Sequence, residues 1–187
     1  YLADLGEARG KQELFTRQAP QRLKVLREHA LIESAVSSNR IEGVTVEKSR
    51  VKTLVLGRPL LRDRDEEEVR GYRDALQRIH AHGARLPVSE KTIRELHRLA
   101  RGEIWDAGKY KEKDSDIIER FANGSQQIRF RTVRAAHTAE AMSKLVASWK
   151  ECLRERWVQP LIAAAAFNLD FLCIHPFRDG NGRVSRL

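Results

Sequence analysis

The stretch that most constrains this chain is its C-terminal run HPFRDGNGRVSRL, His175 to Leu187, which directly follows an apolar segment over residues 161–174. An apolar segment that meets a proline, an aspartate and two glycines predicts a sharp turn that leads into a new helix. Gly180 and Gly182 bracket Asn181, so three consecutive backbone N–H groups can face one point. We expect this nest, at the start of a helix, to bind an anion.

The side chains around the nest are those that nucleotide chemistry uses. Arg183 and Arg186 are three residues apart, so helical spacing predicts that both guanidinium groups reach the same polyphosphate. Asp179 offers a hard oxygen ligand for the Mg²⁺ that accompanies such phosphates. His175 is the side chain of this run that can take up a proton near neutral pH. A turn with a purely structural role needs neither the histidine nor the paired arginines.

The run matches the Fic family signature, HPF-x-[D/E]-G-N-G-R-x-x-R, at every defined position from His175 to Arg186, and the chain therefore resembles a Fic domain. The resemblance implies transfer of AMP from ATP to a Ser, Thr or Tyr hydroxyl of a target protein, with ATP and Mg²⁺ as cofactors. It implies His175 as the base, Asp179 as the metal ligand and Phe177 as an apolar anchor of the loop. The nucleotide-binding residues that it implies are Gly180, Asn181, Gly182, Arg183 and Arg186.

A second motif, SSNRIEG, places Ser38 and Glu42 four residues apart on one helix face, with Gly43 following. From the residues alone this is a helix end with a glycine stop, although a glutamate in a last turn is mildly unfavourable against the helix dipole. Together with the signature it resembles the inhibitory motif [S/T]-x-x-x-E-[G/N] of Fic proteins. The resemblance implies that Glu42 pairs with Arg186 and holds AMP transfer in check.

Three other functions stay open at this point. Some Fic relatives phosphorylate their targets, but these tend to have Lys at the position of Gly182, so AMP transfer is favoured. Glu42 could instead orient a water molecule that removes AMP from a modified protein. A non-catalytic module that binds peptide or nucleic acid is the third alternative, and the intact His175, Asp179 and Arg183 argue against it.

Most of the chain has the residue spacing of amphipathic helices. Thr45 and Ser89 are expected to cap two of them, and Ile93, Leu96 and Leu99 are expected to point inward. The helices are expected at about residues 2–15, 20–43, 46–56, 63–82, 90–100, 138–155 and from Pro160 onward.

Residues 116–121 and 127–133 break this rhythm because they are rich in β-branched and aromatic side chains. Asn123-Gly124 between them is a strong signal for a β-hairpin. The expected fold class is therefore all-α, a compact Fic-like helical bundle with one small β-hairpin. The resemblance implies that this hairpin, 116–133, is a flap that clamps the target peptide as an added strand; a purely structural hairpin is the alternative. The segment GKYKEKD, 108–114, resembles the family's approach to the flap.

Composition agrees with a globular protein, since hydrophobic residues make up 41% and charged residues 33% of the chain. No apolar run approaches the ~18 residues of a membrane-spanning helix, and the N-terminus lacks the layout of a signal peptide. We therefore expect a cytoplasmic protein with no membrane partner, in which Cys152 and Cys173 are free thiols.

We expect one domain over residues 1–187, with the inhibitory motif near 34–43 in its N-terminal helices and a core over about 63–187. The core is expected to be truncated at its C-terminus, because barely one helical turn follows the signature. The net charge of +9 is spread among interleaved acidic residues, so nucleic-acid binding is expected only through a missing C-terminal module. A homodimer is expected by analogy with the family.

Overall fold

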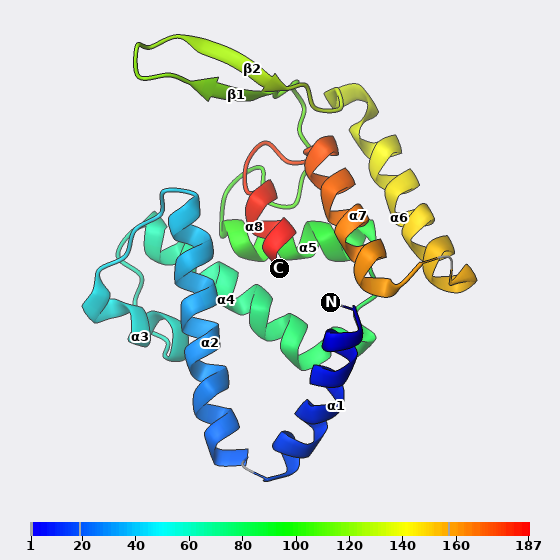
Figure 1. Cartoon of the computed structure of the whole chain (residues 1–187). Helices are drawn as coiled ribbons and strands as arrows, with labels where there is room; N and C mark the ends of the chain where they lie inside the picture. Colours follow the sequence, from blue (N-terminus) through cyan, green and yellow to red (C-terminus); the bar gives the residue numbers. More distant parts are fainter. Residues whose placement is uncertain (1, 19, 157) are drawn as a thin grey trace.

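The chain folds into α-helices and one two-stranded antiparallel sheet, as the computed structural model shows for residues 2–18, 20–156 and 158–187 (Figure 1). The expected all-α fold with one β-hairpin is therefore confirmed. The elements are α1 (Leu2–Gln18), α2 (Pro20–Ile41), α3 (Lys48–Leu56), α4 (Arg64–His82), α5 (Glu90–Arg101), β1 (Ile117–Arg120), β2 (Gln126–Phe130), α6 (Thr138–Glu155), α7 (Pro160–Ile174) and α8 (Asn181–Arg186), with short 3-10 turns at Gly83–Arg85 and Ala135–His137.

Two clusters of buried apolar side chains hold the helices together. The first joins α2, α3, α4 and α5, and its largest member is Tyr72. The second joins α5, α6 and α7 to the loop after α7, where it includes Phe177. Helix α5 contributes to both clusters, and α8 contacts α2, α5 and α7. The C-terminal run therefore lies where the two halves of the bundle meet.

Helices α4 and α5 cross at Gly71, and this crossing requires a glycine. A Cβ atom built at Gly71 would lie 2.1 Å from the backbone oxygen of Leu99, which is closer than any real contact of this kind. The absence of a side chain lets the two backbones touch, and α4 and α5 form an extensive interface. This interface fixes the position of α5 beneath the C-terminal run.

Most helix boundaries lie close to those expected, and the caps explain them. Ser89 accepts a hydrogen bond from the backbone N–H of Thr92 at 3.1 Å, so it caps α5 as expected. Pro160 occupies the first turn of α7, where its missing N–H costs nothing. Helix α1 extends to Gln18, beyond the expected end near residue 15.

The expected cap at Thr45 is wrong. Helix α3 begins at Lys48, and the backbone N–H of Thr45 instead donates to the Asp65 carboxylate at 2.9 Å. Val44 and Val46 pack against the first cluster in this segment, which draws the chain away from a helical path. Tertiary contacts have thus overridden the local capping signal.

The hairpin is confirmed, with strands shorter than expected. Strands β1 and β2 pair in the register Ile118 with Ile128 and Arg120 with Gln126. In the turn, the Asn123 side chain accepts hydrogen bonds from Ser125, and Gly124 has a φ of +83° that favours glycine. The hairpin extends away from the helices (Figure 1). No helix within the described ranges has both the length and the apolar composition needed to cross a bilayer.

Candidate active site

The apolar helix α7 ends at Ile174, and His175 follows it in a left-handed conformation with a φ of +52°. Its backbone N–H donates to the carbonyl of Phe171 at 2.9 Å, which closes the helix end. Side chains other than glycine rarely adopt this conformation, so the loop holds His175 there. Burial, followed by the nearby positive charge of Lys111, lowers the pKa of His175 below its ordinary value. The imidazole is therefore neutral at physiological pH and able to accept a proton.

The loop after His175 is shaped from inside by Phe177 and Asn181. The Asn181 side chain accepts from the backbone N–H of Phe177 at 2.9 Å and donates to its carbonyl at 2.7 Å. Phe177 is fully buried, and its ring stacks on the ring of His97 at a centroid distance of 3.7 Å. The Asn181 side chain thus holds the loop in shape, and its backbone N–H can serve the nest.

His97 fixes the loop from below and was not among the residues predicted from the sequence. Its Nδ1 accepts from the backbone N–H of Gly108 at 2.8 Å, so its Nε2–H donates to the carbonyl of Asp179 at 2.9 Å. Burial is the main cause that lowers the pKa of His97 to about 4. The neutral ring therefore links α5 and the segment after it to the expected metal ligand.

The buried face of α5 includes a residue that the prediction left out, His97. Ile93, His97 and Ala100 are buried, whereas Leu96 and Leu99 are only partly buried. Leu96 nevertheless faces inward, since it lines a cavity between α5, α6, α7 and α8, and His97 joins the buried face because its ring packs against the loop. A histidine four residues after Ile93, on an otherwise apolar stripe, was the signal available in the sequence.

A buried cluster of charges lies beneath the nest. Glu68 of α4 accepts hydrogen bonds from Arg101 at 2.9 Å and from Arg183 through its other oxygen. Arg101 also pairs with the Asp179 carboxylate at 2.9 Å. Glu68 and Arg101 are ordinary charged residues in the sequence, and only the packing of α4 against α5 and α8 brings them to the site. The cluster ties Asp179 to three helices.

Arg186 faces a different partner. Its Nη2 donates to the Glu42 carboxylate at 2.6 Å, and its Nε donates to the Ser38 hydroxyl at 2.9 Å. The two signature arginines therefore have different acidic partners in this structure, because the Arg183 side chain is buried against Glu68 while Arg186 is bound to the end of α2. The structure thus brings Ser38, Glu42 and Arg186 together.

The Glu42 carboxylate lies against the nest. A Cβ atom built at Gly182 would lie 2.5 Å from Oε1 of Glu42 and 2.9 Å from Nη1 of Arg186. Gly180 has a φ of +79°, which turns the chain into α8. An anionic oxygen therefore already lies beside the glycine turn that is predicted to bind one.

The carboxylate of Asp179 suits a magnesium ion that arrives with a nucleotide. Mg²⁺ in such sites is commonly held by one or two carboxylates together with phosphate oxygens and water. Asp179 is exposed and its Oδ1 accepts from the N–H of Gly180 at 2.6 Å. Within the described part of the chain, no group of three or more His, Cys, Asp or Glu side chains forms a cage for a metal. A single carboxylate fits Mg²⁺ that keeps its phosphate ligands.

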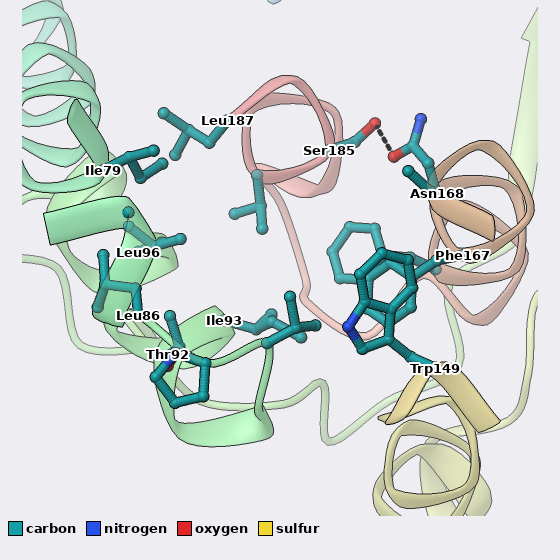
Figure 2. Close-up of a pocket in the computed structure, with 16 residues that line it drawn as sticks. Ile79, Leu86, Thr92, Ile93, Leu96, Trp149, Phe167, Asn168, Ser185 and Leu187 are labelled. Carbon is teal, nitrogen blue, oxygen red and sulfur yellow. Dashed lines mark hydrogen bonds between the residues drawn. The ribbon is translucent and has the colours of Figure 1, made fainter. Parts of the chain in front are cut away.

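An apolar cavity lies apart from these groups. It measures about 320 Å³ and lies between α5, α6, α7 and α8, where Leu96, Trp149 and Phe167 face one another (Figure 2). At its rim Ser185 donates to Asn168 at 2.7 Å. The side chains that line the cavity include no acid, base or other ionisable group, so it lacks the chemistry of an active site.

Comparisons with known proteins place these residues in a family. The sequence pattern of the Fic/DOC family matches residues 87–187, which is more than half of the chain. No curated protein matches. Among solved structures, a Fic domain containing signaling protein from Bacteroides thetaiotaomicron VPI-5482 superposes with a TM-score of 0.74 at 27% identity, over 89% of this chain and 63% of that chain.

Two further structures are similar. A Fic family protein from Desulfovibrio desulfuricans G20 has a TM-score of 0.72 at 25% identity, over 99% of this chain and 53% of that chain. The Fic-1 protein of C. elegans (residues 134–508) has a TM-score of 0.62 at 22% identity, over 87% of this chain and 46% of that chain, and shows the fold alone. The chain thus spans about half to two thirds of the length of these proteins.

Proposed function

This chain belongs to the Fic/DOC family, and on that premise we propose that it is a protein adenylyltransferase, inhibited by Glu42. It would transfer AMP from ATP to a Ser, Thr or Tyr hydroxyl of a target protein. The observation that carries the proposal is the Glu42–Arg186 pair at 2.6 Å. This pair sets a carboxylate beside the signature run, and the proposal takes that carboxylate as inhibitory and His175 as the base.

The proposed reaction uses His175 as general base. The ring nitrogen that is not engaged with the backbone of Leu172 would take the hydroxyl proton as the target oxygen bonds to the α-phosphorus. The bond from that phosphorus to the pyrophosphate oxygen breaks in the same displacement. Backbone N–H groups around Gly182 would stabilise the charge that grows on the α-phosphate.

Asp179 would hold Mg²⁺, which supplies neutralisation of the phosphate charge. The pair with Arg101 and the N–H of Gly180 fix the carboxylate of Asp179 before any nucleotide binds. Arg186 would hold a terminal phosphate once Glu42 has left it. Arg183, buried against Glu68, would support the loop and offer at most one edge of its guanidinium group to a phosphate.

Inhibition would follow from competition for Arg186. A charge-assisted hydrogen bond contributes about 1.5–3 kcal/mol, which corresponds to roughly ten- to more than a hundredfold in population. ATP that cannot reach Arg186 would bind with its α-phosphate out of line for attack. Basal transfer would therefore be low without being abolished.

The target protein would bind through the flap, residues 116–133. Ile118 and Ile128 form a cross-strand pair, and each is about half exposed. An exposed strand edge with apolar side chains suits an extended peptide that adds a third strand. We place the protein in the cytoplasm, where ATP and Mg²⁺ are available; Cys152 and Cys173 are free thiols in this structure.

The test measures transfer of label from α-labelled ATP with Mg²⁺, to the protein itself and to proteins of a cell lysate. Transfer should rise about ten- to a hundredfold in Glu42→Gly relative to wild type, because Arg186 is released. In Glu42→Gly combined with His175→Ala it should fall by roughly 10²–10⁴-fold. His80→Ala, an exposed histidine on α4, is the matched control and should leave transfer unchanged.

Three other results would each change the assignment. Label from γ-labelled ATP alone would indicate a kinase. Release of AMP from a modified protein, without transfer, would indicate the reverse reaction with Glu42 orienting water. No label from either ATP, from a folded chain, would contradict the proposed enzyme and favour a binding module.

A further inference from the structure

The segment 108–114, between α5 and the hairpin, takes no part in the function proposed so far. Its central residue, Lys111, is a lysine with only 5% of its surface exposed. Burying an ammonium group is costly unless it makes hydrogen bonds. The contacts of Lys111 should therefore show why the charge lies inside the protein.

Lys111 binds the backbone on both sides of His175. Its own N–H donates to the carbonyl of Pro176 at 2.8 Å. Its Nζ donates to the carbonyl of Ile174 at 3.2 Å. The carbonyl groups of the residues before and after His175 are thus both held by Lys111, one through its side chain and the other through its backbone.

The same ammonium group binds the base of the hairpin. The Nζ of Lys111 donates to the Thr132 hydroxyl at 2.7 Å, just after β2. That hydroxyl donates in turn to the carbonyl of Ser115, just before β1, at 2.8 Å. The two ends of the flap and the histidine loop therefore meet at Lys111.

Lys111 also acts on His175 through its charge. Burial is the first cause that lowers the pKa of His175, and the positive charge of Lys111 is the second. The negative charges of Asp179, on the same loop, and of Glu42, at the end of α2, act in the opposite direction. Lys111 is thus the cation that favours the neutral, proton-accepting form of the ring.

We propose that Lys111 is a positioning residue for the transfer reaction, which holds His175 in its left-handed conformation and joins it to the base of the hairpin. The inference rests on the proposed function for the reaction that it serves. Lys111 acts through His175 and does not itself touch the reacting atoms. Removing the charge and the hydrogen bonds of Lys111 should change the pKa and the ring conformation of His175 even when no ATP is present.

The test compares Lys111→Met with Lys111→Arg, which keeps a charged donor, and with Lys113→Met, which removes a charge from an exposed lysine of the same segment. Nuclear magnetic resonance titration without ATP follows the ring signal of His175, assigned from its loss in His175→Ala. Lys111→Met should raise the pKa of His175. Lys111→Arg should keep it near the wild-type value, and Lys113→Met should leave it unchanged.

Transfer is then measured for the same variants in a Glu42→Gly background. Lys111→Met should lower kcat by roughly 10–100-fold with little change in KM for ATP, because His175 is misplaced while the nucleotide-binding groups are intact. Lys111→Arg should recover most of this loss. An unchanged His175 pKa and an unchanged kcat in Lys111→Met would overturn the proposal, as would equal effects of Lys111→Met and Lys113→Met.

The experiment still decides the role of Lys111 if the Glu42→Gly chain is inactive or if Lys111→Met does not fold. If the Glu42→Gly chain transfers no label, the proposed function fails while the titration still decides the effect of Lys111 on His175. If Lys111→Met does not fold, Thr132→Val replaces it, since it removes one acceptor of the ammonium group and keeps the charge. That variant should shift the His175 ring signals and lower kcat by about two- to tenfold; unchanged signals and kcat would overturn the proposal.

Discussion

The signature loop and the hairpin are the two non-helical parts that carry the proposed function, and they are built in opposite ways. In the loop, Phe177 is 0% exposed and Asn181 is 2% exposed, and hydrogen bonds from α5 and from residue 111 fix the backbone. In the hairpin, Ile118 is 48% and Ile128 is 47% exposed. The loop is packed into the bundle. In the hairpin, by contrast, about half of the surface of these two side chains is exposed, and within the described part of the chain the two strands pair only with each other.

This difference separates chemistry from recognition. Groups that must act on a phosphate are held in place before the substrate binds, so little ordering is left for the reaction itself. A surface that binds another protein needs groups that are still free to make contacts. The unpaired backbone N–H and C=O groups of an exposed strand edge can form hydrogen bonds with an added strand. Substitutions in the loop should therefore change stability, and substitutions in the hairpin should change target choice.

The largest effect is expected for the buried charge beneath the loop. Glu68→Gln should lower the free energy of unfolding by about 3–5 kcal/mol, because Arg101 and Arg183 lose a counter-charge in a buried site. Urea unfolding measures the change. The control Glu47→Gln removes the acid of an exposed pair with Arg62 and should cost less than about 1 kcal/mol. Similar losses in both variants would contradict the buried role of Glu68.

A smaller effect that depends on pH is expected for His97. Its pKa is lowered from 6.5 to about 4 in the folded protein, so the unfolded state takes up a proton first as the pH falls. His97 therefore favours unfolding by up to about 3 kcal/mol as the pH falls from its unfolded pKa to its folded pKa. His97→Phe keeps a ring against Phe177 and has no such proton.

Urea unfolding of wild type and His97→Phe between pH 7 and pH 4, with EDTA present, tests this expectation. At pH 7 the variant should be less stable by about 1–3 kcal/mol, because the N–H of Gly108 and the carbonyl of Asp179 lose their partner. The difference should shrink toward pH 4. A difference that stays constant with pH would show that His97 does not titrate as a buried group.

The smallest effect on stability is expected in the hairpin. The double variant Ile118→Ser with Ile128→Ser should change the free energy of unfolding by less than about 0.5 kcal/mol per residue, since both side chains are half exposed. Labelling of target proteins in a lysate should nevertheless fall roughly tenfold, with self-labelling unchanged. Gln126→Ser, on the same strand, is the control. Equal loss of self-labelling and target labelling would argue against a recognition role.

The sequence was sufficient for the features that depend on local patterns. Helical spacing predicted the bundle, Asn123-Gly124 predicted the hairpin, and the order of residues from His175 to Arg186 predicted the family. The sequence was not sufficient to predict the start of α3, because the backbone N–H of Thr45, the expected cap, donates a hydrogen bond to a carboxylate twenty residues away. Local capping signals compete with tertiary hydrogen bonds, and the sequence does not show which will prevail.

The supporting residues were missed for a related reason. His97 is 82 positions from Asp179, and Glu68 is 115 positions from Arg183. Charged residues on amphipathic helices are usually solvated, so nothing in the local sequence distinguishes Glu68 from the other acidic residues at the start of α4. Their roles arise only when α4 and α5 cross at Gly71 and present them to the loop.

The position of Glu42 in the sequence determines when it is synthesised relative to Arg186. Glu42 precedes Arg186 by 144 residues, so a ribosome adding about 5–20 residues per second makes the carboxylate on the order of ten seconds before the arginine. Helix α2 and the turn after it, which carries Glu42, are thus synthesised before any part of the signature run. Under the proposed inhibition, Glu42 would already be present when Arg186 is synthesised, so each new molecule could fold directly into the inhibited form. Regulation in the cell would then consist of separating Glu42 from Arg186.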